Sequence, residues 1–176
     1  MNKKVKKIVV LDNIRSVFNV GSIFRTSDAL GVDKIYLCGC TPTPKDRFGR
    51  DRNDLAKVAL GAQNNIEWEY CQTTEEVIKI LKKEKVQIIA LEQAENSVDY
   101  KKIKIKCSTA IVLGEEVSGL SKEVLKLADI VAEIPMKGKK ESLNVSVAFG
   151  VAGYNFWGEY CTTRVFPFSN RSAQEN

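Results

Sequence analysis

Short apolar runs rich in Val and Ile alternate with helical patterns along most of this chain. The apolar runs predict strands at Lys6–Leu11, Lys34–Cys38, Ile66–Tyr70, Gln87–Leu91, Thr109–Leu113 and Ile130–Ile134. Apolar residues spaced by three and four predict helices at Val20–Leu30, Thr74–Glu84, Lys122–Ala128 and Asn144–Tyr160. This alternation is typical of an α/β fold with a mainly parallel sheet and helices on both faces.

The length of the chain bounds its organisation. At 176 residues it can bury one substantial core but is short for two ordinary domains, so we expect a single domain at 1–168. The polar tail Ser169–Asn176 has the composition of a disordered segment. The loop Gly39–Asp54 is long, contains two prolines and is densely charged, and long loops in compact domains are usually functional.

The composition excludes several kinds of chemistry. With no histidine, the chain cannot carry a Ser-His-Asp or Cys-His centre, a His-ligated zinc or a phosphohistidine. The five cysteines do not have metal-binding spacing, which favours reduced thiols and no metal. The apolar run Ile8–Leu11 is too short for a secretory signal, and Val145–Trp157 contains polar residues and glycines. We therefore expect a soluble cytoplasmic protein without a membrane partner.

A glycine-containing segment, Gly114–Ser121, follows one predicted strand at the edge where α/β proteins bind ligands. Its two glycines have P-loop spacing, but Leu120 occupies the place of the required lysine. Glu115 and Glu116 would repel a triphosphate and favour a positively charged nucleoside ligand. A tight turn without a ligand is the alternative for this segment taken alone.

Two further polar segments flank helix starts. Ser142 and Asn144 follow the strand that ends in Ile134-Pro135-Met136, and each could simply cap a helix. A helix start beside a crevice also offers free N–H groups to a ligand. The third segment, Asn19–Arg25, combines a polar residue, a glycine and an outward-facing arginine. Taken alone, such an arginine is most often only a solvated surface residue.

Together these segments resemble the SPOUT superfamily, and within it the SpoU-like ribose 2′-O-methyltransferases that act on tRNA or rRNA. The resemblance covers about Lys6–Tyr160 and rests on Asn19–Arg25, Leu113–Ser121, Ile134–Met136 and Ser142–Val145, in the family's order. One position departs from the pattern: relatives commonly have Gly-Asn-Glu where this chain has Gly114-Glu115-Glu116.

The resemblance implies S-adenosylmethionine as cofactor, a deep C-terminal trefoil knot and an obligate homodimer. It places the cofactor against Leu91, Gly114, Glu116, Ile134, Met136, Ser142, Leu143 and Asn144. It makes Arg25 the residue that holds and activates the ribose 2′-hydroxyl or its neighbouring phosphate, in a site ordered by Asn19, Glu116, Ser142 and Asn144. Because a guanidinium stays charged at neutral pH, we expect Arg25 to position and stabilise charge rather than to abstract a proton.

The last predicted helix agrees with a homodimer. Its small residues Ser146, Gly150 and Gly153 would let another helix approach, and Phe149, Phe156 and Trp157 add a large apolar area. Burial of this helix within one subunit is the alternative.

The expected RNA partner would meet a group of basic residues, Arg15, Lys45, Arg47, Arg50 and Arg52. Phe48 lies among them and could stack on a base or serve packing alone. Because the first predicted strand begins near Lys6, we expect no added amino-terminal RNA-binding domain, and this expectation favours tRNA over rRNA. One alternative is an RNA-binding or assembly factor of the same fold without turnover. A second alternative is a nucleotide hydrolase, against which Leu120 argues because it stands where a P-loop has its lysine.

Overall fold

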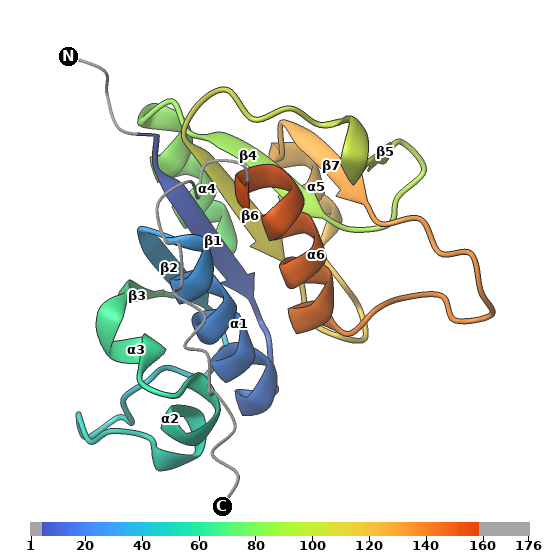
Figure 1. Cartoon of the computed structure of the whole chain (residues 1–176). Coiled ribbons are helices and arrows are strands. Elements are labelled where there is room, and N and C mark those ends of the chain that lie inside the picture. Colours follow the sequence, from blue (N-terminus) through green and yellow to red (C-terminus); the bar gives the residue numbers. More distant parts are fainter. Residues whose placement is uncertain (1–4, 159–176) are drawn as a thin grey trace, which may run out of the picture.

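A computed structural model describes residues 5–158, and its centre is one seven-stranded parallel sheet (Figure 1). The strand order is β3-β2-β1-β6-β4-β7-β5. The strands are β1 (Lys7–Asp12), β2 (Lys34–Cys38), β3 (Glu67–Cys71), β4 (Gln87–Leu91), β5 (Val98–Asp99), β6 (Thr109–Leu113) and β7 (Ile130–Glu133). All neighbouring strands pair in parallel, so their carboxyl ends lie at one edge.

Helices cover both faces of the sheet, as the alternating pattern predicts. They are α1 (Val17–Leu30), α2 (Asn53–Ala59), α3 (Ala62–Asn65), α4 (Thr74–Lys83), α5 (Lys122–Leu127) and α6 (Val145–Trp157), with a 3₁₀ turn, η1, at Tyr100–Lys102. Helices α1, α2, α3 and α6 contribute to a core on one face, and α4 and α5 to a core on the other. Alternate residues of the central strands serve the two cores: Val9 and Leu11 of β1 face α1, and Ile8 and Val10 face α4.

The predicted elements agree closely with the structure, and the differences have local causes. Strands β2, β4 and β6 have the predicted bounds, β1 and β3 are shifted by one residue, and β7 ends one residue earlier. The two-residue strand β5 is too short to give an alternating pattern and was not predicted.

The helices differ at both ends: α4 and α5 begin where predicted and end one residue earlier, and α6 begins one residue later. Helix α1 begins three residues earlier than predicted, because Ser16 caps it by accepting a hydrogen bond from the Asn19 N–H. Helix α2 begins at the last two residues of the predicted loop and extends beyond it, and its N-cap, Arg52, makes no side-chain capping bond. Neither α2 nor α3 was predicted from the sequence. The end of the predicted helix at Tyr160 and the tail Ser169–Asn176 lie outside the described residues.

The expectation that the aromatic residues of α6 add to a dimer surface is wrong. Phe149, Phe156 and Trp157 are buried against the sheet and α1 of their own chain. A Cβ on Gly153 would lie 2.7 Å from Leu30 Cδ1, so this glycine allows α6 to approach α1 within the subunit. The face that α6 exposes instead carries Val147, Val151 and Tyr154.

The sheet brings the polar segments to one edge. The loops that follow β1, β2, β4, β6 and β7 all lie at the carboxyl ends of their strands. They include residues 13–16, 39–52, 114–121 and 134–144, which hold most of the predicted functional residues. No helix in the described part of the chain is long and apolar enough to cross a membrane.

Candidate active site

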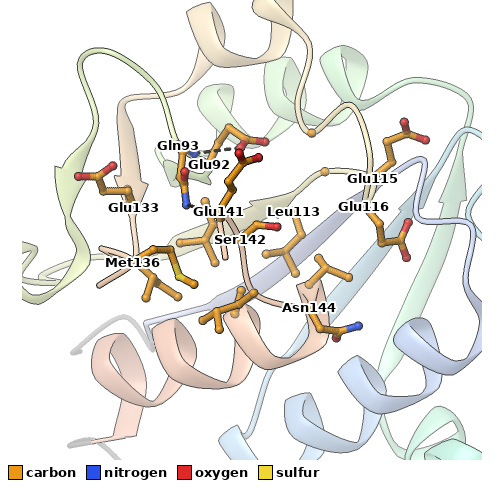
Figure 2. A pocket seen from close by; sticks show the side chains of 18 of the residues that line it. Glu92, Gln93, Leu113, Glu115, Glu116, Glu133, Met136, Glu141, Ser142 and Asn144 are labelled. Carbon is orange, nitrogen blue, oxygen red and sulfur yellow. Dashed lines mark hydrogen bonds between the residues drawn. The ribbon is translucent and has the colours of Figure 1, made fainter. Parts of the chain in front are cut away.

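A cavity of about 470 Å³ opens at the carboxyl ends of β4, β6 and β7. This volume is typical of a site for a small molecule or a cofactor. Its walls include all eight residues that the family resemblance places against a cofactor: Leu91, Gly114, Glu116, Ile134, Met136, Ser142, Leu143 and Asn144. In Figure 2, Glu141, Ser142 and Leu113 lie in the middle of the view, with Glu133 and Met136 at one side and Glu115 and Glu116 at the other.

One side chain, Asn19 on α1, joins the three polar segments. Its Nδ2 donates to Glu116 Oε1 at 2.6 Å, and its Oδ1 accepts from Asn144 Nδ2 at 3.1 Å. Asn144 also caps α6, since its Oδ1 accepts from the Ser146 N–H at 3.0 Å. The capping role of Asn144 and its place in the site therefore coexist, because its two amide atoms serve different partners.

The segment Gly114–Ser121 forms a closed loop above β6. Glu115 and Gly119 form an isolated antiparallel bridge. The Glu115 carboxylate accepts from the Ser118 N–H at 3.0 Å and from the Ser118 hydroxyl, and lies 3.0 Å from Arg15. These Ser118 donors, followed by Arg15, hold the pKa of Glu115 below its usual value. The charge that departs from the family pattern thus has partners within the protein.

Glu92, which was not predicted from the sequence, also stabilises this loop. Glu92 follows β4, lines the cavity and accepts a hydrogen bond from the Leu120 N–H at 2.9 Å. A Cβ on Gly119 would lie 2.2 Å from Glu92 Oε2, and Gly119 has a positive φ of 65°, so this position requires glycine. A polar residue directly after a buried strand was the available signal, because the segment Gly114–Ser121 also begins directly after a buried strand.

Glu92 is followed by a second residue of the cavity that was missed. The Gln93 Nε2 donates to the Glu141 carbonyl at 2.7 Å and so links the loop after β4 to the segment before α6. Figure 2 shows Gln93 and Glu141 close together at the rim. This bond helps to fix the wall that contains Ser142.

The chemistry of the walls favours a cationic ligand with an apolar part. Carboxylates come from Glu92, Glu115, Glu116, Glu133 and Glu141. Apolar side chains come from Leu91, Leu113, Ala132, Ile134, Met136, Leu143, Val145 and Ala148. The carboxylates oppose a phosphate group and attract a positive one, while the apolar walls suit an aromatic base.

Arg25 lies elsewhere on α1. It is exposed and is not among the residues that line the cavity. No ion pair between described residues involves it. Phe18, two turns earlier on the same side of the helix, is 72% exposed. Within the described residues, Arg25 is therefore an exposed cation without an ion pair, on a partly apolar surface rather than in the cavity wall.

The basic residues expected to meet RNA have different environments. Arg50 pairs with Asp46 at 2.8 Å, Arg52 with Asp54 at 2.6 Å and Arg15 with Glu115 at 3.0 Å. Lys45 and Arg47 are exposed and have no ion pair with another described residue. Exposed ion pairs are weak and can exchange a carboxylate for a phosphate, so all five cations remain candidates for RNA contacts. Across the described residues, no group of three or more His, Cys, Asp or Glu side chains is arranged to hold a metal ion.

Comparisons with known proteins agree with this geometry. Residues 6–154 match the model of the SpoU rRNA Methylase family. The chain is 32% identical over 146 residues to the tRNA (guanosine(18)-2′-O)-methyltransferase of Escherichia coli, a match that covers 83% of this chain and 60% of that relative. The chain thus spans about three fifths of the length of this curated relative.

Solved structures have the same fold. An AdoMet-bound rRNA methyltransferase from Sinorhizobium meliloti superposes with a TM-score of 0.79 at 30% identity, over 87% of this chain and 56% of that one. The A. aeolicus TrmH/SpoU tRNA-modifying enzyme superposes with a TM-score of 0.75 at 29% identity, over 87% and 74%. Because the family model spans both the sheet and the three segments that Asn19 joins, this chain belongs to the SpoU rRNA methylase family.

Proposed function

We propose that this protein transfers a methyl group from S-adenosylmethionine to a ribose 2′-hydroxyl of structured RNA, with tRNA favoured over rRNA. The observation that carries the proposal is the amide of Asn19, which ties the Glu116 loop to the start of α6 at the mouth of an acidic cavity. The name of the Escherichia coli relative, a tRNA 2′-O-methyltransferase, supports the reaction and the preference for tRNA.

The cavity fits S-adenosylmethionine by charge and by shape. The cofactor would supply an electrophilic methyl group on a positively charged sulfur. Leu91, Ile134, Met136 and Leu143 would pack on its base, and the backbone at Gly114 would approach it closely. Glu116, with Ser142 and Asn144, would bind its polar part, and the surrounding carboxylates would favour its positive charge. The AdoMet-bound relative from Sinorhizobium meliloti supports this assignment.

The remaining residues would act on the RNA. Arg25 would bind the ribose 2′-hydroxyl or its neighbouring phosphate and stabilise negative charge as the hydroxyl proton leaves. Asn19 would keep Glu116 and Asn144 in place. The loop 39–52 and Arg15 would bind phosphates beside the cavity, so RNA and cofactor would occupy a basic and an acidic part of one edge.

The proposed assembly is a homodimer through the exposed faces of α6 and α1. Val147, Val151 and Tyr154 on α6, with Phe18 on α1, give these packed helices an apolar surface. A second copy on this surface would cover the side of α1 that carries Arg25. The dimer would in this way bring Arg25 toward one of its two active sites. We also infer the family's C-terminal trefoil knot, a single domain at 1–168 and a cytoplasmic location.

The test is methyl transfer by an Arg25→Ala variant. We expect wild-type protein to transfer labelled methyl groups to bulk tRNA at positions that then resist alkaline hydrolysis. Arg25→Ala should lose nearly all transfer and keep cofactor affinity by calorimetry, because Arg25 is outside the cavity wall. Lys79→Ala, on the opposite face of the sheet, is the matched control and should be fully active.

Three results would contradict the proposal. Label found on bases alone would exclude the ribose, and near-normal transfer by Arg25→Ala would remove Arg25 from the mechanism. RNA binding by wild-type protein with no cofactor binding would favour the alternative, an RNA-binding or assembly factor of the same fold.

A further inference from the structure

The loop between β2 and α2 ends in a tightly closed turn at residues 45–51. Lys45 and Asp51 pair as an antiparallel bridge, and the Asp46 N–H donates to the Arg50 carbonyl at 2.8 Å. The Gly49 N–H donates to the Asp46 carbonyl at 2.9 Å, with Gly49 at a positive φ of 78°. The turn is therefore held by backbone hydrogen bonds.

One carboxylate fixes the tip of this turn. Asp46 Oδ1 accepts from the Phe48 N–H at 2.8 Å and from the Arg50 N–H at 3.0 Å. Asp46 Oδ2 accepts from Arg50 Nε and pairs with its terminal nitrogen, both at 2.8 Å. Backbone and guanidinium of Arg50 are thus bound by the same side chain, and Arg50 is held in place before any ligand arrives.

The turn presents an aromatic ring among cations. Phe48 is 66% exposed, and the guanidinium carbons of Arg47 and Arg50 lie 4.7 Å and 5.0 Å from its ring centroid. Cation–π attraction accounts for these contacts. Arg50 is neutralised by Asp46, whereas Arg47 has no ion pair with another described residue. Two guanidinium groups repel each other at one ring, so Arg47 is the group that an incoming anion would draw away.

We propose that Phe48 and Arg50 form a stacking platform for an unpaired base of the RNA, and that Arg47 binds the phosphate beside that base. This inference rests on the proposed RNA substrate. Paired RNA offers phosphates but keeps its bases stacked in the helix. An exposed aromatic ring of the protein can therefore stack only on a base in a loop, a bulge or an end of the RNA. A flat aromatic ring and a fixed guanidinium plane both suit a base face, while Arg47, which has no ion pair with another described residue, suits an anion.

The platform is on the same edge of the sheet as the cavity. It follows β2, and the cavity lies beyond β1, after β6, β4 and β7. Figure 1 shows the loop beside α2, at the end of the molecule where α1 begins. RNA bound there would extend across the start of α1 toward the Asn19 network.

The test compares Phe48→Leu, which removes the π face but keeps an apolar side chain, with Phe48→Trp, which keeps the face. The probes are a fluorescein-labelled RNA hairpin with an unpaired loop and a fully paired duplex of equal length. Phe48→Leu should bind the hairpin roughly 5- to 100-fold more weakly and the duplex unchanged. Phe48→Trp should bind both as the wild type does. Arg47→Gln should weaken both and lower the salt-dependence slope by about one.

Separate readouts distinguish this inference from the proposed function. Phe48→Leu should raise the KM for bulk tRNA with an unchanged kcat and keep cofactor affinity by calorimetry. If the wild-type enzyme is active and Phe48→Leu changes neither hairpin binding nor the KM for tRNA, only the platform is overturned. If the wild-type protein transfers no methyl group but Phe48→Leu still weakens hairpin binding, the proposed function is overturned and the platform stands. Equal loss on hairpin and duplex, or no RNA binding by wild-type protein, would overturn the platform.

Discussion

Asn19 is the residue whose role depends most on distant partners. Its amide donates to Glu116, 97 positions along the chain, and accepts from Asn144, 125 positions along. A side chain that both donates and accepts is needed here, because Glu116 offers only an acceptor and the Asn144 amide nitrogen only a donor. Aspartate, with nearly the same shape, would repel Glu116.

We predict that Asn19→Ala lowers the free energy of unfolding by about 1–3 kcal/mol, since two hydrogen bonds of roughly 0.5–1.5 kcal/mol each are lost. Cofactor affinity should fall as well, because Glu116 and Asn144 line the cavity. Denaturant unfolding and calorimetry measure the two effects. Ser22→Ala, one turn along α1, is the control. Unchanged cofactor affinity in Asn19→Ala would show that the hydrogen bonds of Asn19 do not shape the cavity.

We predict that Glu115→Asn changes cofactor affinity little or improves it, because Ser118 and Arg15 already occupy the Glu115 carboxylate. Its effect should appear in the pH dependence of stability. The pKa of Glu115 is lowered, so its contribution is present above the usual value of 4.5 and is lost as the pH falls through the lowered value. The Tm difference from wild type should stay constant from pH 7 to about 4.5 and shrink below it. A marked loss of cofactor affinity at pH 7 would be the contrary result.

At the scale of elements, the helices are predicted where capping and periodicity agree. Thr73 and Ser121 cap α4 and α5 by accepting from the Glu76 and Val124 N–H groups, as their sequences indicate. Helix α2 has no such signal, and its position depends on α1. A Cβ on Gly21 would lie 2.8 Å from Val58 Cβ, so the glycine of the first family segment allows these two helices to pack.

We predict that Gly21→Val destabilises the protein by about 1–3 kcal/mol, the usual cost of overpacking. The new Cβ would lie 2.8 Å from the Val58 Cβ and 3.2 Å from the Leu55 carbonyl oxygen, and neither atom can rotate away as the end of a long side chain can. Thermal unfolding measures the loss. Ser22→Val, at the neighbouring and partly exposed position, controls for a β-branched residue in α1. Equal Tm values for the two variants would show that α2 moves freely to make room.

At the scale of the whole molecule, the acidic cavity and the basic turn lie at different places along one edge of the sheet. The carboxylates of the cavity come from the end of β7 and the loops after β4, β6 and β7, and the loop after β2 carries the basic turn. The loop after β7 also carries Lys137, Lys139 and Lys140. The Arg15–Glu115 pair lies at the boundary between the cavity and the basic turn. A cationic cofactor and an anionic RNA are therefore attracted to neighbouring positions without competing for them.

We predict that Val151→Glu converts a dimer to a monomer, because a carboxylate would be buried in the proposed interface. Sedimentation velocity measures the change. Ile80→Glu, on the exposed side of α4 across the sheet, is the matched control and should leave the sedimentation coefficient unchanged. A Val151→Glu protein that sediments as the wild type does would exclude this surface as the interface.

The sequence by itself determined the α/β class, the bounds of six of the seven described strands to within one residue, and the edge of the sheet that holds the site. Those features follow from local periodicity and from residues that come directly after a strand. Only the tertiary structure decided that Asn19 lies between Glu116 and Asn144, that Glu92 holds the Leu120 N–H, and that Phe149, Phe156 and Trp157 face inward. Such contacts depend on strand order and on how the helices pack, because a helix pattern shows which residues are apolar but not which neighbour covers them.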